Sequence, residues 1–412
     1  MESGVTEVAA GGASDPAGGL EERLAELMRD FPPIVCFAND WRGDPTSKHH
    51  IMRLLGKHVP VLWVESSGMR RPNLASPADL RRIAGRLRRQ AVAPVAPAAA
   101  AEPGVRVISP LCLPLPGNPI AERVNAWLYR RAVRGAQPAG RPPLLWVYQP
   151  TVAPYLDGIP RSGLVYHCVD RWWAFSEFDS KAMRRYHAEL CRKADVVFAS
   201  AAELQEDCRQ YNPDAVLMPH GVDWDHFSRA AFAPPPRPAD IADITGPIIG
   251  FFGLLHDWID QELLLRVSEE LPEATMVLIG KARVDISRLV ARPNIRWLGQ
   301  KPYAELPAYA AAFDVALVPF VRNHLTAAVN PIKLLEYLSA GVPVVATALP
   351  EIVRMGERPG LAVTGDQCEF LTVVGERVQR RKTGPERHAI SIAQRNDSWI
   401  GRCVRMVENV TS

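Results

Sequence analysis

The chain has 412 residues, of which 47% are hydrophobic and 23% are charged, and its formal net charge is +3. This length favours two or more domains, and the composition is ordinary for a globular protein. No stretch is apolar for long enough to span a membrane, and residues 1–30 lack the basic start and apolar run of an export signal. The seven cysteines are odd in number and widely spaced, which indicates a reducing compartment. We therefore expect a cytoplasmic protein.

Residues 1–30 are predicted to be a disordered N-terminal extension, because the first part is rich in Gly, Ala, Ser and acidic residues. An alternation of strands and helices then begins at Phe31. It predicts a Rossmann-like domain over 31–235 that ends at the proline-rich segment 231–240. The expected strands are 34–38, 59–65, 105–109, 144–148, 164–168, 196–199 and 215–218, and a helix is expected over 48–57.

Arginines are concentrated in the first half of the chain, and most densely in the predicted amphipathic helix 77–90. Two interpretations of this helix stay open. It is either a solvated surface helix, or a basic patch, Arg81 to Arg89, that contacts anionic lipid or an anionic acceptor. The second interpretation gives peripheral contact with the inner face of a membrane.

A second Rossmann-like domain is predicted over 236–375, where strands again alternate with helices. The expected strands are 248–252, 275–279, 295–298, 315–319 and 342–346, with helices over 261–270 and 303–311. Residues 376–412 are predicted to form helices that can pack back on the N-terminal domain. The fold class is therefore α/β, with two doubly wound parallel sheets whose ligands bind at the carboxyl ends of the strands.

One short helix in the second domain carries the most chemical information. Asn330 is a favourable N-cap, Pro331 suits the first helical position, and Gly341 ends the helix. Lys333 and Glu336 then lie three residues apart on one face, near the helix start. The positive helix end with Lys333 suits a phosphate, and Glu336 could reach hydroxyl groups. The alternative is a solvent-exposed ion pair without a ligand.

An ordered set of motifs resembles the GT-B glycosyltransferases of the family 4 type, known as glycosyl transferases group 1. The motifs are Pro-His-Gly-Val-Asp at 219–223, Ile-Gly-Phe-Phe-Gly at 249–253, 313–319, and Lys333-x-x-Glu336 followed by Gly341. The resemblance implies two domains facing across a cleft, with a nucleoside diphosphate sugar held by the C-terminal domain. It implies that Lys333 lies at the phosphates and Glu336 at the ribose, that the reaction retains configuration, and that neither a cofactor nor a metal is required.

This chain departs from the family pattern at Ala328, where the family usually has a glutamate. The donor site is therefore predicted to be built differently. Candidate contributors, besides Lys333 and Glu336, are Gly253, Lys281, Thr326, Asn330 and Ile332. Gly253 has a second interpretation as a routine strand-to-helix turn.

Polar and aromatic residues at two strand ends of the first domain are the acceptor-side candidates. The first group is Asn39, Asp40, Trp41 and Arg42, for which a capping loop is the equal alternative. The second group is His167, Asp170, Trp172 and Trp173, which combine hydrogen-bonding and stacking groups suited to sugar rings. His167 and Asp170 are candidate catalytic residues together with Lys333, although retention does not require a general base.

These features predict a bacterial glycosyltransferase of envelope polysaccharide or secondary-metabolite biosynthesis. Its expected partners are a nucleotide sugar and a small-molecule, glycan or lipid-linked acceptor, with no nucleic acid. No residue grouping has metal-ligand spacing, and neither a serine-hydrolase elbow nor a P-loop occurs. A nucleotide-sugar epimerase of the same architecture, or a non-catalytic sugar-nucleotide-binding scaffold, are the alternatives.

Overall fold

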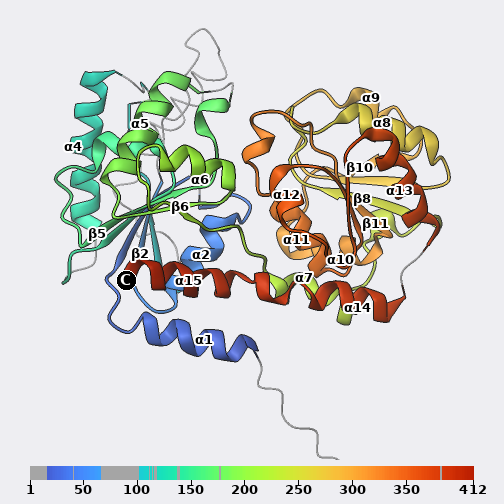
Figure 1. The fold of residues 1–412 in the computed structure, drawn as a ribbon, viewed down its shortest axis with the longest axis horizontal. Helices are drawn as coiled ribbons and strands as arrows, with labels where there is room; N and C mark the ends of the chain where they lie inside the picture. Colours follow the sequence, from blue (N-terminus) through green and yellow to red (C-terminus); the bar gives the residue numbers. More distant parts are fainter. Residues whose placement is uncertain are drawn as a thin grey trace, which may run out of the picture.

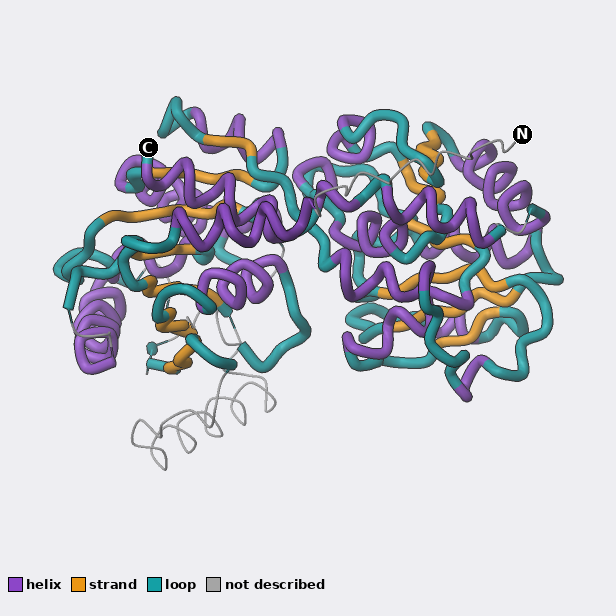
Figure 2. Tube along the Cα trace, turned by 90° about the horizontal axis from the view of Figure 1, so that it is seen from below, coloured by secondary structure: helices purple, strands orange, loops and turns teal. Residues whose placement is uncertain are grey.

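The computed structural model describes residues 16–39, 41–65, 102–110, 112–113, 115, 118–136, 140–175, 178–380 and 383–412. Two α/β domains lie side by side and are joined along one edge by α7, α14 and α15 (Figure 1). A view from below shows the strands of each domain lying between helices (Figure 2). Asp40 and the basic segment Arg81 to Arg89, both named by the sequence analysis, lie outside the described residues.

The N-terminal domain contains a seven-stranded parallel sheet of order β3-β2-β1-β4-β5-β6-β7. The central strand β1 is buried along its whole length, as its continuous apolar sequence predicts. The strands are β1 (Ile34–Ala38), β2 (Val61–Glu65), β3 (Val105–Ile108), β4 (Leu144–Val147), β5 (Gly163–Cys168), β6 (Val196–Ala199) and β7 (Val216–Leu217). The helices are α2 (Ser47–Gly56), α4 (Pro119–Ala136), α5 (Ser180–Lys193) and α6 (Ala202–Arg209), with 3-10 turns η1 (Pro150–Tyr155) and η2 (Trp172–Ala174).

The C-terminal domain contains a six-stranded parallel sheet of order β10-β9-β8-β11-β12-β13. Its strands are β8 (Ile248–Phe252), β9 (Thr275–Ile279), β10 (Ile295–Trp297), β11 (Val315–Val318), β12 (Val344–Thr347) and β13 (Leu361–Thr364). Its helices are α7 (Trp224–Phe232), α8 (Gln261–Glu270), α9 (Ser287–Val290), α10 (Leu306–Ala312), α11 (Ile332–Ser339), α12 (Pro350–Arg354), α13 (Gln367–Gln379) and α14 (Gly384–Ile392). The 3-10 turns are η3 (Ala239–Ile241), η4 (Tyr303–Glu305), η5 (Thr326–Ala328) and η6 (Arg395–Asp397). The predicted pair of doubly wound α/β domains is confirmed.

The last helix, α15 (Trp399–Thr411), belongs to the N-terminal domain. Its residues Trp399, Cys403 and Met406 are buried in the same core cluster as β1. It packs against α2 and against α1 (Pro16–Leu27), which lies beside it in Figure 1. The expectation of disorder through residue 30 is therefore wrong, because Leu24 and Met28 form an apolar stripe that α15 covers.

The boundary between the domains lies earlier than the proline-rich segment suggests. Val222 and Phe227 are buried in the core of the C-terminal domain, as is Ile390 near the other end of that domain. The chain crosses between the domains twice, at Val222 and at Ser398, which form a parallel bridge. Consecutive prolines exclude a helix and a central strand, but they do not prevent a segment from packing on a domain. The segment 231–240 therefore lies on the surface of the C-terminal domain and does not mark its boundary.

Candidate functional site

The helix α11 places Lys333 at the carboxyl edge of the second sheet. It begins at Ile332, and Pro331 is its N-cap residue with an extended conformation (φ −79°, ψ 103°). The prediction that Asn330 caps this helix is therefore wrong by one position, because Pro331 does not take helical dihedral angles. The Lys333 ammonium lies 5.3 Å from the centre of the Phe252 ring, at the end of β8. The Lys333 side chain thus reaches from the start of α11 to the end of β8.

Lys333 and Glu336 contact each other, but they differ strongly in exposure. Lys333 Nζ lies 3.3 Å from Glu336 Oε2, and the two side chains are 37% and 5% exposed. The alternative to a ligand site was an ion pair with both side chains in water. The buried carboxylate of Glu336 does not fit that alternative. A buried charge needs a partner, so Glu336 holds Lys333 in place beside the strand ends.

Two glycines bring the ends of β8 and β9 unusually close together. A Cβ atom on Gly280, whose φ is +139°, would lie 1.8 Å from the carbonyl oxygen of Gly253. A Cβ atom on Gly253 would lie 3.5 Å from Cε of Lys333. Only glycine permits this approach. Gly253 and Lys333 also line one space beside the turn.

That space is a cavity of about 140 Å³ at the carboxyl ends of β8 and β11. Its lining is mostly apolar, and Lys333 is the one charged residue in it. Small-molecule sites usually enclose roughly 300 to 1,000 Å³, so this cavity is smaller than a typical complete ligand site. The lining residues are Phe251, Gly253, Leu254, Trp258, Ile259, Leu317, Val318, Phe320 and Lys333.

The other donor-side candidates occupy different environments. Lys281 is exposed and directly follows Gly280. Thr326 is fully buried, and its hydroxyl donates to the carbonyl of Val321 at 2.5 Å, so it is engaged within its own turn. Ile332 packs against the core of the N-terminal domain, and Asn330 is half-buried. Ala328, in place of the usual glutamate, is buried in that same core cluster, so its small side chain serves a contact between the domains.

The strand ends that carry the acceptor-side candidates surround Lys48, which the sequence patterns did not indicate. Lys48 is 5% exposed, and its ammonium donates to Asn39 Oδ1 at 3.0 Å. It lies 5.7 Å from the Trp172 ring centre and 5.9 Å from that of Tyr148. Burial lowers the pKa of Lys48, while the charge of Asp170 opposes this effect. The structure therefore brings Asn39, Asp170 and Trp172 together around a buried cation from the first turn of α2.

Asp170 shares the electrostatic environment of Lys48. Burial raises the pKa of Asp170 to about 6, the charge of Lys48 opposes the rise, and Cys168 adds to it. His167 is 1% exposed, and its ring lies 5.0 Å from the Tyr148 ring in a stacked arrangement. Burial holds the pKa of His167 well below its usual value, so the imidazole is neutral.

Several buried polar groups at the ends of β4 and β5 lack a partner among the described residues. They are both ring nitrogens of His167, both side-chain amide atoms of Gln149, the hydroxyl of Thr151 and the indole nitrogen of Trp172. Buried polar atoms are nearly always hydrogen-bonded, so such a concentration indicates a site that a polar ligand completes. Gln149 and Thr151 carry no sequence motif, and only their position after a predicted strand could have suggested them.

Three sequence candidates lie away from this centre. Trp41 packs on Trp63 and His49, and its backbone N–H donates to Glu65 Oε1 at 3.0 Å. Trp173 packs on His187, with ring centres 4.6 Å apart. Arg42 is exposed on the loop after β1.

Loops from the two sheets contact each other between the domains. Arg171, which follows β5, donates from Nη1 to the carbonyl of His324 at 2.9 Å. The buried carboxylate of Glu351 accepts from the backbone N–H of Ala202 at 2.7 Å. Burial lowers the pKa of His50 to about 3, with nearby cations, Lys333 among them, adding to the effect. The donor-side cation therefore lies close to the N-terminal domain.

Comparison with known proteins identifies the class to which this arrangement belongs. The structure of Anabaena Alr3699/HepE in complex with UDP and glucose is similar over 92% of this chain and 100% of its own, with a TM-score of 0.63 and 16% identity. Sucrose-phosphate synthase from Thermosynechococcus elongatus is similar over 92% of this chain and 98% of its own, with a TM-score of 0.65 and 14% identity. These likenesses show the fold, which is GT-B.

Two further similarities come from the sequence. Residues 246–378 match the family model described as glycosyl transferases group 1. TuaH of Bacillus subtilis (strain 168), named as a teichuronic acid biosynthesis glycosyltransferase, is 26% identical over 208 residues, which are 47% of this chain and 52% of TuaH. The match thus spans about half the length of that relative. Residues 246–378, which make up most of the C-terminal domain, are thus similar to the glycosyl transferases group 1 family, and the fold of the chain is that of the GT-B glycosyltransferases.

Proposed function

We propose that this protein transfers a sugar from a nucleoside diphosphate sugar to an acceptor hydroxyl, with retention of configuration. The observation that carries the proposal is Lys333, which lines a cavity at the carboxyl edge of the group 1 domain. The relatives support the donor class, since one is solved with UDP and glucose and another is named as a UDP-forming trehalose-phosphate synthase. The pathway is proposed to be envelope polysaccharide or secondary-metabolite biosynthesis.

In the proposed reaction, the diphosphate lies against Lys333 and the start of α11. The bond between the anomeric carbon and the phosphate oxygen breaks, and the acceptor hydroxyl attacks from the same face. Its proton passes to the departing diphosphate, so no protein base is required. Lys333 and the positive helix end stabilise the charge that develops on the leaving group. The diphosphate draws Lys333 away from Glu336, whose carboxylate then accepts a hydrogen bond from the ribose.

The acceptor and the transferred sugar are proposed to occupy the region around Lys48. His167, Gln149, Thr151 and Trp172 supply the unpartnered polar groups there, and Asp170 supplies a carboxyl group. Because sugars present many hydroxyl groups, they match a site that offers several buried donors and acceptors. Contacts such as Arg171 with the carbonyl of His324 then hold the domains together around the reactants.

A lipid-linked acceptor would make contact with a membrane surface useful, and α4 supports such a contact. Ile120 and Trp127 on this helix are 71% and 57% exposed, and Arg123 and Arg131 belong to the same helix. We infer that this face meets anionic lipid, with tryptophan at the interface and arginine at the headgroups. Within the described residues, none of the helices is apolar over a length that would span a bilayer.

Isothermal titration calorimetry with UDP and other nucleoside diphosphates tests the donor site. A charge-assisted hydrogen bond to phosphate contributes about 1.5 to 3 kcal/mol, so Lys333→Ala should weaken binding roughly 10- to 150-fold. Arg288→Ala is the control, because Arg288 lies on α9 and pairs with Glu262 away from the cavity. Equal, tight binding by wild type and Lys333→Ala would overturn the assignment.

Mass spectrometry of product mixtures distinguishes the alternative activities. A sugar mass added to an acceptor supports transfer. Conversion of the donor to an isomer would instead indicate an epimerase, and binding without chemistry would indicate a scaffold.

A further inference from the structure

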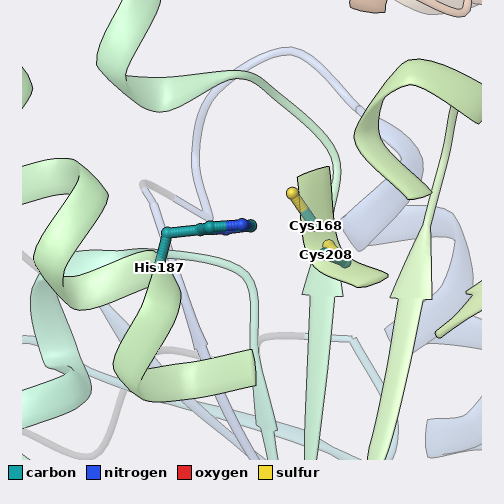
Figure 3. A group of neighbouring side chains, drawn as sticks. All are labelled: Cys168, His187 and Cys208. Atoms are coloured by element: carbon teal, nitrogen blue, oxygen red, sulfur yellow. The ribbon is translucent and has the colours of Figure 1, made fainter. Parts of the chain in front are cut away.

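Four buried side chains of the N-terminal domain converge behind the proposed acceptor region. Cys168 ends β5, His187 and Cys191 lie one turn apart on α5, and Cys208 lies on α6. The three cysteines are fully buried, and His187 is 2% exposed. Figure 3 shows the His187 imidazole directed toward the sulfur atoms of Cys168 and Cys208. We propose that Cys168, His187, Cys191 and Cys208 bind one zinc ion as a closed structural site.

The distances between the ligand atoms are near those of a tetrahedral zinc site. The ligand atoms of Cys168, His187 and Cys208 all lie within 4.8 Å of one another. Cys191 Sγ lies 3.7 Å from Nε2 of His187. Zinc bonds of about 2.3 Å to sulfur and 2.0 Å to nitrogen give tetrahedral edges of roughly 3.6 to 3.8 Å. Among Cys168, His187 and Cys208, binding therefore requires the most distant pair of ligand atoms to approach by about 1 Å, and Cys191, which lies outside that group of three, has to move as well.

The surroundings of His187 fit the role of a ligand. The Tyr166 hydroxyl lies 3.0 Å from Nδ1 of His187, so its oxygen can accept a hydrogen bond from Nδ1–H and leave Nε2 free for the metal. Trp173 covers the imidazole, and Tyr211 meets it edge-on with ring centres 6.0 Å apart. An aromatic shell of this kind excludes water, as structural metal sites require.

The ligand set selects the metal and its role. Three thiolates and one imidazole are soft and borderline donors, which favour zinc over magnesium or calcium. With four protein ligands the tetrahedron is complete, so no position remains for a catalytic water. The ion would connect the end of β5 to α5 and α6, immediately before the segment that carries Asp170 and Trp172.

The spacing in the sequence explains why no metal was predicted. The only short-range signal is His187-x-x-x-Cys191, which places two ligands on one helical face. The other two cysteines come from a strand and from another helix. The fold, not a local motif, assembles the site.

Elemental analysis of the full-length protein, purified without chelator, tests the proposal. We expect one zinc ion per chain in the wild type and in the controls Cys368→Ser, which changes an exposed cysteine, and Cys403→Ala, which changes a buried cysteine outside the cluster. Cys208→Ser and His187→Ala should lose most of the metal. Substoichiometric zinc in the wild type, or full zinc in both ligand variants, would overturn the proposal.

Three measurements on the wild type keep the test valid if the ligand variants fail to fold. Cobalt(II) added to chelator-stripped protein should give thiolate-to-metal charge-transfer absorption and the visible bands of tetrahedral cobalt. Removal of zinc should lower the unfolding midpoint by roughly 5 °C or more. An octahedral cobalt spectrum would contradict the proposal. So would two cysteines of the cluster found in a disulfide by thiol titration of the denatured protein.

Discussion

Gly280 offers a sharp test of how the donor site is built. Alanine at this position would place Cβ 1.8 Å from the carbonyl oxygen of Gly253, in a backbone conformation with φ of +139°. The conformation costs about 1 to 2 kcal/mol, and relief of the overlap costs about 1 to 3 kcal/mol more. Gly299 provides a control for positive φ, which is +67° there, because no atom lies within 4 Å of a Cβ placed at that position. Gly299→Ala should therefore cost only the free energy of the backbone conformation, about 1 to 2 kcal/mol.

Thermal unfolding followed by calorimetry measures the difference between the two variants. The additional 1 to 3 kcal/mol for Gly280→Ala corresponds to a midpoint roughly 2 to 12 °C below that of Gly299→Ala in the transition of the C-terminal domain. Nucleotide binding should weaken as well, because relief of the overlap displaces Gly253 at the cavity wall. Equal midpoints for the two variants would refute the claim that close approach, rather than backbone conformation alone, requires Gly280.

Three further predictions concern the two sides of the site and the proposed membrane face. Glu336→Gln replaces a charged hydrogen-bond acceptor with a neutral one, so the Kd for nucleoside diphosphate should rise by about 5-fold, corresponding to about 1 kcal/mol. An unchanged Kd in calorimetry would contradict the proposed contact between Glu336 and the ribose. Lys48→Met removes the buried cation beside Asn39 and should lower the transfer rate about 10-fold or more while donor binding is preserved; a wild-type rate in a product assay would contradict this role. Trp127→Ser should reduce co-sedimentation with anionic vesicles roughly 10-fold, whereas Val290→Ser, an exposed control on α9, should not; equal sedimentation of the two variants would argue against contact through α4.

The architecture could be predicted because strands and helices are specified by patterns within short segments of the sequence. Each buried strand is a short apolar run, and the helix around Lys333 is bounded by Pro331 and Gly341, so spacing alone placed Lys333 near the start of that helix. The error at Pro331 is equally local, since extended and helical dihedral angles are both available to proline at a helix start. The burial of Glu336 could not be predicted, because it depends on elements outside the helix.

Lys48 and Gln149 escaped prediction for a different reason. Lysine in the first turn of a helix is normally solvated, and only the arrangement of β1, β4 and β5 encloses Lys48. Gln149 becomes informative only through its missing hydrogen-bond partners, a property of the folded environment. Sequence patterns located the edge of the sheet, while the tertiary structure determined which side chains are enclosed there.

The bridge between Val222 and Ser398 has a topological consequence. Residues between these two positions form the C-terminal domain, whereas both the first described helix and the last one pack on the N-terminal domain. The C-terminal domain is thus an insertion within the chain of the N-terminal domain, and two adjacent segments of polypeptide connect the two domains. Rotation about these two connections would open the two domains without separating them, and labels on α1 and α15 would both report the N-terminal domain.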